Sequence, residues 1–269
     1  MEYGICLQSV VPVRSESSHR SEMVTQLLFG ELFRIVGREE NWRRIQLLYD
    51  DYEGWAHEAQ ITYLKEEEFI HLEQAVTPVS TDLVQLMIRE SQNDMIPVVP
   101  GSSLPGLANG TLTIAGEKFI YDGAVSRDDL ISMPPGAGKE AIIREQIREN
   151  AFLYLNAPYQ WGGRSPFGLD CSGFTQMVFK LVHIQLFRDA AQQSTQGEGV
   201  SFLNEAMTGD LAFFDNEEGY ITHVGILFDN NSIIHCSGKV KVDMLDHEGI
   251  YDLSQNKYTH KLRLIKRII

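Results

Sequence analysis

Residues 159–174 read Tyr159-Gln160-Trp161-Gly162-Gly163-Arg164-Ser165-Pro166-Phe167-Gly168-Leu169-Asp170-Cys171-Ser172-Gly173-Phe174. This glycine-rich loop leads into an apolar run whose members are Phe174, Met177, Val178, Leu181 and Val182. Side chains at steps of three and four residues share one face of a helix. Cys171 is therefore predicted on the first turn of a helix, with Asp170 as the N-cap whose carboxylate accepts a backbone N–H.

The position of Cys171 suggests a reactive thiol. A cysteine at a helix N-terminus faces the positive end of the helix dipole, which favours the nucleophilic thiolate over the thiol. The alternative is a structural cysteine in the core, because free cysteines are among the most buried residues. The local pattern alone leaves both interpretations open.

Two histidines on predicted strands are candidates for the base that a cysteine nucleophile needs. His223 opens a strand at 222–229 and His235 lies in the next strand at 232–238, with a hairpin turn expected at Asn230-Asn231. Facing residues on paired strands are close enough for one imidazole to orient the other. Strand alternation places Cys236 on the opposite face from His235, outside their site. A zinc site made of Cys171, His223 and His235 is the alternative, although no HExxH or CxxC spacing supports it.

Composition sets the class of the protein. The chain has 269 residues, 43% of them hydrophobic, and a formal net charge of −14. This charge argues against nucleic acid or an anionic membrane as partner. The three cysteines (Cys6, Cys171, Cys236) form no CxxC pair, and no window resembles a signal peptide or a membrane span. We therefore expect a cytoplasmic monomer without metal or cofactor.

The remaining pattern predicts three parts. Residues 1–64 alternate as short strands and predict a small barrel, with Phe33 and Ile35 on one face and a hairpin turn at 49–52. Residues 65–135 predict a second, divergent β domain that ends in a turn-rich linker at 133–138. Residues 136–269 begin with helical spacing over 140–155 and continue as consecutive strands. This order predicts an α+β domain with helices packed on an antiparallel sheet.

Four segments of the last part together resemble the NlpC/P60 cysteine peptidases. They are the motif at 159–174, Gly-Asp-Leu-Ala-Phe-Phe at 209–214, His-Val-Gly-Ile at 223–226 and Ile-His-Cys-Ser-Gly at 234–238. The segments 28–31, 41–45 and 52–56 resemble bacterial SH3-like (SH3b) domains. The combination is similar to the γ-D-glutamyl-L-diamino-acid endopeptidases, also called the dipeptidyl-peptidase VI type. The resemblance implies a papain-like catalytic domain preceded by small all-β SH3-like barrels.

The resemblance also implies roles for individual residues. Cys171 is the expected nucleophile, His223 the general base and His235 the orienting third member. The Cys171 backbone N–H and the Tyr159 hydroxyl are expected to stabilise the oxyanion. Substrate-binding roles are expected for Glu31, Tyr52, Asp170, Ser172 and Asp189, and the alternatives for Tyr159 and Glu31 are a core aromatic and a solvated turn residue.

The expected activity is hydrolysis of the bond between γ-linked D-glutamate and a diamino acid in murein peptides. Acidic groups at the end of the cleft would hold the free amine of an N-terminal L-alanine, because a buried ammonium needs a counter-charge. This restriction would make the enzyme a recycler of released stem peptides. Two alternatives remain: a wall-peptide-binding module with an inactive catalytic domain, and a thiol acyltransferase with a lipid or amine acceptor.

Overall fold

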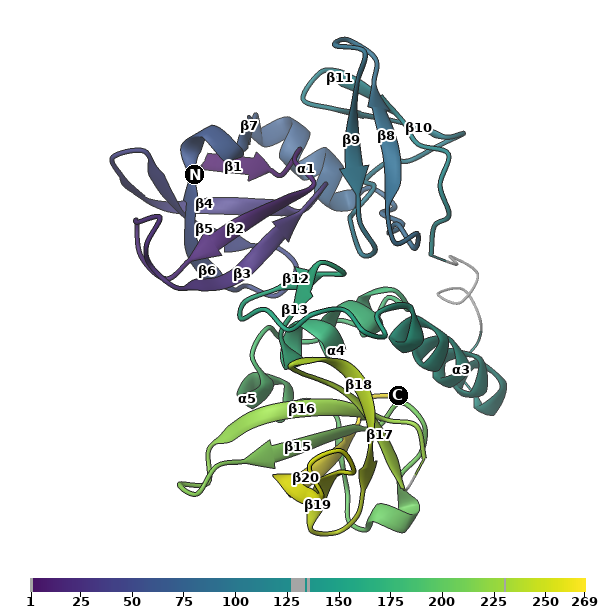
Figure 1. Cartoon of the computed structure of the whole chain (residues 1–269). Coiled ribbons are helices and arrows are strands. Elements are labelled where there is room, and N and C mark those ends of the chain that lie inside the picture. The colour runs from purple at the N-terminus through teal and green to yellow at the C-terminus, as the bar shows by residue number, and fades with distance from the viewer. Residues whose placement is uncertain (1, 127–133, 135, 230) are drawn as a thin grey trace. The chain divides into compact units, whose positions relative to one another are not determined.

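The computed structural model describes residues 2–126, 134, 136–229 and 231–269. The chain forms two compact units, Met1–Asp128 and Asp129–Ile269 (Figure 1). The predicted linker at 133–138 and the predicted boundary after residue 135 lie partly outside the described residues, as does the turn at Asn230-Asn231. The three-part division of the chain stays a prediction.

The first unit begins with a seven-stranded antiparallel sheet. Its strands are β1 (Glu2–Ile5), β2 (Val10–Arg14), β3 (Met23–Leu28), β4 (Leu32–Glu39), β5 (Trp42–Leu47), β6 (Glu53–His57) and β7 (Thr62–Leu64), in spatial order β3-β2-β6-β5-β4-β1-β7. Phe33 and Ile35 are both buried, as their spacing on β4 predicts. The predicted hairpin turn is confirmed, because β5 pairs with β6 and Asp51 between them has a φ of 57°.

A helix and a second sheet complete this unit. After the 3₁₀ turn η1 (Glu58–Gln60) and β7 comes α1 (Glu66–Gln74), which buries only Phe69 and Leu72 and therefore carries a weak sequence pattern. The strands of the second sheet are β8 (Gln85–Arg89), β9 (Asp94–Val98), β10 (Thr111–Ile114) and β11 (Glu117–Ile120), in order β10-β11-β8-β9. One apolar core joins both sheets to α1, with members that include Ile5, Phe29, Phe69, Met87 and Phe119.

The second unit begins with helices. The helix predicted at 140–155 is α3 (Ala137–Leu153), and the short hairpin β12 (Arg164–Ser165) and β13 (Gly168–Leu169) leads into α4 (Cys171–Lys180). A short helix, α5 (Ala190–Gln193), was not predicted. Every residue of α4 is buried, and the helix packs against strands β16 and β17. Its apolar members contribute about 1.5–3 kcal/mol each through burial.

A closed antiparallel sheet follows the helices. Its strands are β14 (Glu198–Val200), β15 (Leu211–Asp215), β16 (Ile221–Leu227), β17 (Ser232–Ser237), β18 (Lys239–Leu245), β19 (Gly249–Asp252) and β20 (Lys257–Arg267), with the 3₁₀ turn η2 (Leu203–Glu205) before β15. The order is β14-β20-β15-β16-β17-β18-β19, and an additional pairing of β19 with β20 closes a barrel. In Figure 1, α3 and α4 lie on the same side of this barrel. The predicted α+β class is confirmed.

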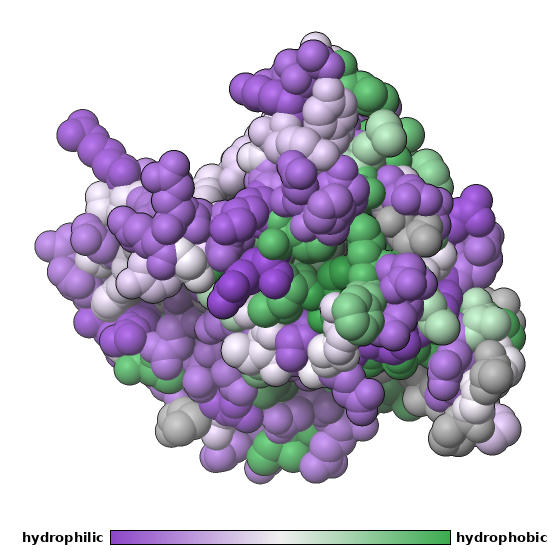
Figure 2. Space-filling view, turned by 90° about the horizontal axis from the view of Figure 1, so that it is seen from below, coloured by the Kyte–Doolittle hydropathy of each residue, from purple (hydrophilic) through white to green (hydrophobic). Residues whose placement is uncertain are grey.

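The face of the molecule drawn in Figure 2 is largely hydrophilic, with an apolar area near its centre. Polar and charged residues cover most of the face in Figure 2, in keeping with the formal net charge of −14. Among the residues that the structure describes, no helix is both long enough and apolar enough to cross a bilayer.

Candidate active site

Asp170 holds the loop before α4 in place. Its carboxylate accepts the backbone N–H of Gly173 at 2.6 Å and that of Gly162 at 2.8 Å, which confirms the predicted N-cap. The buried Arg188 guanidinium donates to the same carboxylate at 2.6 and 3.0 Å. These bonds occupy most of the accepting capacity of Asp170, so the geometry favours a positioning role, and its substrate-binding role stays a prediction.

The glycines of the motif permit a close approach between the loop and the helix. A Cβ on Gly173 would lie 2.2 Å from the carbonyl oxygen of Gly163, and a Cβ on Gly163 would lie 2.2 Å from that of Gly168. Gly162 has a φ of 74°, in the region that glycine tolerates best. The loop therefore packs directly on the first turn of α4 and fixes the Cys171 backbone.

Cys171 is the first residue of α4, and its side chain lies against β16. The residue is 8% exposed, and its Sγ lies 4.0 Å from the carbonyl oxygen of Thr222. Burial, and then the nearby Asp170 carboxylate, raise the pKa of the Cys171 thiol to about 12. The predicted thiolate is therefore not the favoured resting form, because burial favours the neutral thiol.

The two predicted histidines meet through their rings. His223 Nε2 and His235 Nδ1 lie 2.8 Å apart, with the ring planes at 84°. The residue directly opposite His235 is Gly225, so the two histidines are diagonal neighbours across β16 and β17. A Cβ on Gly225 would lie 2.8 Å from the Cβ of His235, so the missing side chain leaves room for the histidine pair.

Two further side chains extend this pair, and the sequence did not predict them. His235 Nε2 lies 3.0 Å from Asp243 Oδ2 on β18, and the His260 ring on β20 stacks on His223 with centroids 4.1 Å apart. Burial lowers the pKa of both His223 and His235, that of His223 strongly, and lowers the pKa of His260 to about 4. The resting pair is therefore neutral at pH 7.

A cavity of about 340 Å³ opens beside this cluster, lined by Tyr159, Thr222, His223, Cys236, Ser237, Gly238 and His260. Tyr159 is 37% exposed, so the alternative of a core aromatic is wrong. Its pKa is raised to about 12, by burial first and then by the nearby Cys171, so the hydroxyl keeps its proton at neutral pH. Cys236 also lines this cavity, and its thiol donates to the Leu169 carbonyl at 3.1 Å, away from the hydrogen-bonding partners of His235.

The described residues contain one group with metal-ligating side chains in range of one another. The ligand atoms of His223, His235 and His260 lie within 4.8 Å of one another. However, His223 and His235 share a hydrogen bond, and His260 stacks nearly parallel to His223, at 24°. Such rings do not aim their lone pairs at one point, as tetrahedral zinc requires. Cys171, which the zinc alternative needs, is not in this group.

The comparison with known proteins decides the family. Residues 156–263 match the model of the NlpC/P60 family, and residues 13–61 match that of the bacterial dipeptidyl-peptidase SH3 domain. The γ-D-glutamyl-L-lysine dipeptidyl-peptidase of Bacillus subtilis (strain 168) is 31% identical over 263 residues, which cover 93% of this chain and 80% of that protein. This chain belongs to the NlpC/P60 family. The resemblance of the four motif segments and the SH3-like segments is confirmed.

Two other proteins are similar to this NlpC/P60 protein over most of its length. Dipeptidyl-peptidase 6 of Lysinibacillus sphaericus is 23% identical over 269 residues, which cover 91% of this chain and 92% of that protein. A crystal structure of an NlpC/P60 protein from Bacillus cereus has a TM-score of 0.82 at 20% identity, with 99% of both chains covered. The latter likeness shows a shared fold.

Arg188 donates a hydrogen bond to the predicted residue Ser172 and directly precedes the predicted residue Asp189 in the sequence. Ser172 Oγ accepts from Arg188 at 3.0 Å and donates to Asp170 at 3.3 Å, so it belongs to the ion-paired network beneath the loop. Asp189 precedes α5, and its backbone N–H donates to Gln192 Oε1 at 3.2 Å. The signal that would have identified Arg188 is its position directly before Asp189.

Glu31 and Tyr52 belong to the first unit. Glu31 is 3% exposed, and its Oε2 accepts the backbone N–H of Leu28 at 2.9 Å. The alternative of a solvated turn residue is therefore wrong for Glu31. Tyr52 is half-buried, and its backbone N–H donates to Asp50 at 3.1 Å. The substrate-binding roles of both residues stay predictions.

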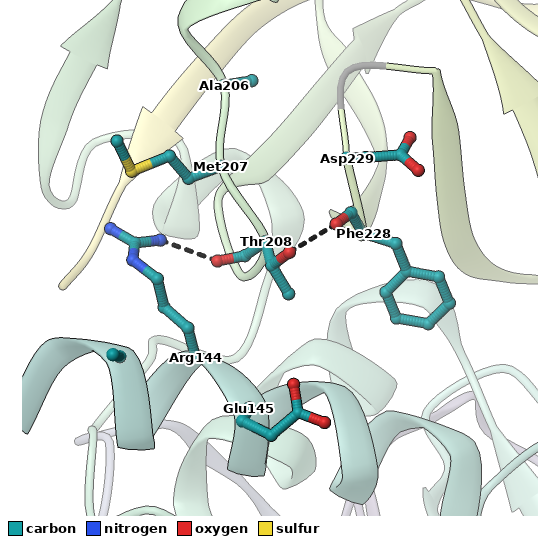
Figure 3. A pocket seen from close by; sticks show the side chains of 8 residues that line it. Arg144, Glu145, Ala206, Met207, Thr208, Phe228 and Asp229 are labelled. Atoms are coloured by element: carbon teal, nitrogen blue, oxygen red, sulfur yellow. Dashed lines mark hydrogen bonds between the residues drawn. The ribbon is translucent and has the colours of Figure 1, made fainter.

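A second cavity of the NlpC/P60 domain, about 490 Å³, lies away from these groups (Figure 3). Arg144 on α3 donates there to the Thr208 carbonyl at 2.7 Å, and Thr208 Oγ1 donates to the Phe228 carbonyl. The described side chains that line it include no cysteine and no histidine. The residues predicted for catalysis are therefore not among those that line this second cavity.

Proposed function

We propose that this protein is a cysteine peptidase that hydrolyses the bond between γ-linked D-glutamate and the following diamino acid in murein peptides with a free N-terminal L-alanine. One observation supports the reaction type: His223, which is hydrogen-bonded to His235, lines a cavity together with Tyr159 and Thr222, and the carbonyl oxygen of Thr222 lies 4.0 Å from Cys171 Sγ. The substrate class rests on the matches to a γ-D-glutamyl-L-lysine dipeptidyl-peptidase and to dipeptidyl-peptidase 6. The product peptides suggest a role in recycling, and a cytoplasmic site of action stays part of the proposal.

In the first step, His223 takes the thiol proton of Cys171 while the sulfur attacks the γ-carbonyl carbon of D-glutamate. Proton transfer accompanies attack, because the buried thiol and the buried imidazoles are neutral at rest. The Cys171 backbone N–H, which has no intrahelical partner at the first position of α4, and the Tyr159 hydroxyl donate to the oxyanion.

The tetrahedral intermediate then collapses, and the C–N bond breaks. His223 returns its proton to the departing amine of the diamino acid, and a thioester links L-Ala-D-Glu to Cys171. A water molecule, deprotonated by His223, attacks the thioester, the C–S bond breaks, and the Cys171 thiolate takes back the proton from His223 as L-Ala-D-Glu is released. The two half-reactions use one base twice, as in other acyl-enzyme mechanisms.

The test is cleavage of L-Ala-γ-D-Glu-L-Lys and L-Ala-γ-D-Glu-meso-diaminopimelate, followed by mass spectrometry of the products. We expect L-Ala-D-Glu and the free diamino acid, and no products from Cys171→Ala with unchanged circular dichroism. Peptide binding without cleavage would favour the wall-binding module. Transfer of the acyl group to added amine in preference to water would favour the acyltransferase.

The predicted amine clamp has its own test. Glu31→Gln and Asp189→Asn should raise KM for peptides with a free N-terminus, because each removes a counter-charge for the ammonium. The N-acetylated twin should be a poor substrate for the unaltered protein and should not respond to either substitution. Equal cleavage of the two peptides would remove the clamp and leave the thiol mechanism in place.

A further inference from the structure

The carboxylate of Asp243 forms the end of a chain of three side chains. Asp243 Oδ2 lies 3.0 Å from His235 Nε2, and His235 Nδ1 lies 2.8 Å from His223 Nε2. The Asp243 side chain is 11% exposed and that of His235 is fully buried. Strand register produces this chain: Asp243 pairs with Ile233 on β17, which makes it a diagonal neighbour of His235.

The chemistry of this chain determines where its protons lie. An ionised carboxylate only accepts hydrogen bonds, so the hydrogen of neutral His235 lies on Nε2. Its Nδ1 then carries a lone pair and accepts the Nε2–H of His223. A neutral His223 with hydrogen on Nε2 has its lone pair on Nδ1. That nitrogen is the one left to receive a proton from a thiol.

We infer that Asp243 is a positioning residue that sets the tautomers of both histidines, so that His223 presents an unprotonated Nδ1. The inference rests on the proposed function for its catalytic meaning. A third member that is a histidine supplies no net charge, and Asp243 adds the carboxylate that such a pair lacks. This role parallels that of the aspartate in Ser-His-Asp triads, with one more imidazole between the carboxylate and the base.

The charges around Asp243 come from three strands. Lys241 on β18 lies 2.8 Å from Asp243 Oδ2 and also 2.8 Å from Asp252 Oδ2 on β19, and His260 on β20 stacks on His223. Lys241 is shared between two carboxylates, so these three groups together keep one negative charge. Asp243 raises the pKa of His235 and Lys241 lowers it. Removal of Asp243 and removal of Lys241 should therefore shift the pKa of the histidine pair in opposite directions.

The experiment compares Asp243→Asn with the matched variant Lys241→Met in the full chain. Iodoacetamide labelling of Cys171 is followed as a function of pH by peptide mass spectrometry. The labelling rate reports how well His223 accepts the thiol proton, and the measurement does not need the peptide substrate. For Asp243→Asn we expect about 10- to 100-fold slower labelling at pH 7. We also expect the fall in labelling rate at acidic pH, the acidic limb, to occur at lower pH than in the unaltered protein. This loss is smaller than the roughly 10⁴-fold cost of a wrong tautomer in a serine triad, because Asp243 acts through a second ring. For Lys241→Met we expect the limb at higher pH.

The tautomers can be observed directly. In protein with ¹⁵N-labelled histidine, the two-bond ¹H–¹⁵N correlations of His223 and His235 should each show hydrogen on Nε2, and Asp243→Asn should produce mixed tautomers. Unchanged tautomers in Asp243→Asn would overturn the inference. So would equal loss of labelling in both variants with unmoved limbs, the mark of a purely structural ion pair. Normal labelling with no peptide cleavage by the unaltered protein would overturn the proposed function alone.

Discussion

At the scale of single residues, the state of the resting site follows from burial. The thiol of Cys171 has a pKa raised to about 12, and burial lowers the pKa of His223 strongly. Burial thus favours the neutral thiol and the neutral imidazole at this site. In the proposed mechanism the charge pair forms only during attack, and the Tyr159 hydroxyl and the helix N-terminus would then stabilise the negative charge on the acyl oxygen.

The pH dependence of the reaction follows from the histidine pKa values. Protonation removes the lone pair of the base, so activity is lost as pH falls through the pKa of the histidine pair. Because both pKa values are lowered from 6.5, kcat/KM should fall at acidic pH with a midpoint below pH 6.5. Initial rates from pH 4.5 to 8 measure this limb. A midpoint at or above pH 6.5 would mean that the base is a solvated histidine.

The hydroxyl of Tyr159 has a separate prediction. Tyr159→Phe removes one oxyanion donor and keeps the ring, so kcat should fall about 100-fold with little change in KM. Steady-state kinetics of the folded variant provide the measurement, with iodoacetamide labelling of Cys171 as the control for an intact nucleophile. An unchanged kcat would show that the Tyr159 hydroxyl does not stabilise the oxyanion and that the residue only lines the cavity.

The sequence identified the residues of the site better than it identified their ionisation. Cys171, His223, His235 and Tyr159 lie in short motifs whose spacing can be recognised without a structure. Asp243 and His260 lie outside those motifs, on later strands. Their approach to the histidine pair depends on strand register and on the pairing that closes the barrel. Neither property is set by local sequence.

At the scale of elements, β16 and β17 place the two histidines through a glycine. Gly225 pairs directly with His235 in the ladder, and the imidazole of His235 contacts that of His223, its diagonal neighbour. His223 and His235 are diagonal neighbours and do not pair directly. The absence of a side chain at Gly225 leaves space beside His235, and His223 Nε2 and His235 Nδ1 come within 2.8 Å of each other. The predicted strands and the helix at Cys171 carried clear periodicity. The elements that were not predicted include α1, α5 and β19, which are short or polar.

Gly225→Ala tests this packing. The new Cβ would lie 2.8 Å from the Cβ of His235 and 2.7 Å from Ile233 Cδ1, so the His235 side chain must move. We expect about a 100-fold loss of kcat from misplacement of the pair, with a stability loss of about 1–3 kcal/mol. Gly199→Ala on β14 is the control, since a Cβ added there would meet no atom within 4 Å. Similar kinetics for both variants would show that the pair tolerates displacement.

At the scale of the whole molecule, the chain consists of two compact units. The first carries the SH3-type match and the second the NlpC/P60 match. The buried histidine cluster ties the stability of the second unit to pH. His223, His235 and His260 bind protons less readily in the folded state than in the unfolded chain, where the pKa is about 6.5.

Acidification should therefore destabilise the fold in a defined window. Below pH 6.5 the unfolded chain binds more protons than the folded one, so the free energy of unfolding falls as pH falls toward about 4, the lowered pKa of His260. The thermal midpoint should be lower at pH 5 than at pH 7, and His260→Gln should reduce that difference. A midpoint that is equal or higher at pH 5 would contradict the burial of neutral imidazoles.

The most direct test of the central claim is to trap the acyl-enzyme. The protein is mixed with L-Ala-γ-D-Glu-L-Lys, quenched in acid during the first turnover and digested for peptide mass spectrometry. We expect an L-Ala-D-Glu adduct on the peptide that contains Cys171, removed by hydroxylamine and absent from Cys171→Ser. Cleavage of the substrate by Cys171→Ala, or an adduct on another residue, would contradict it.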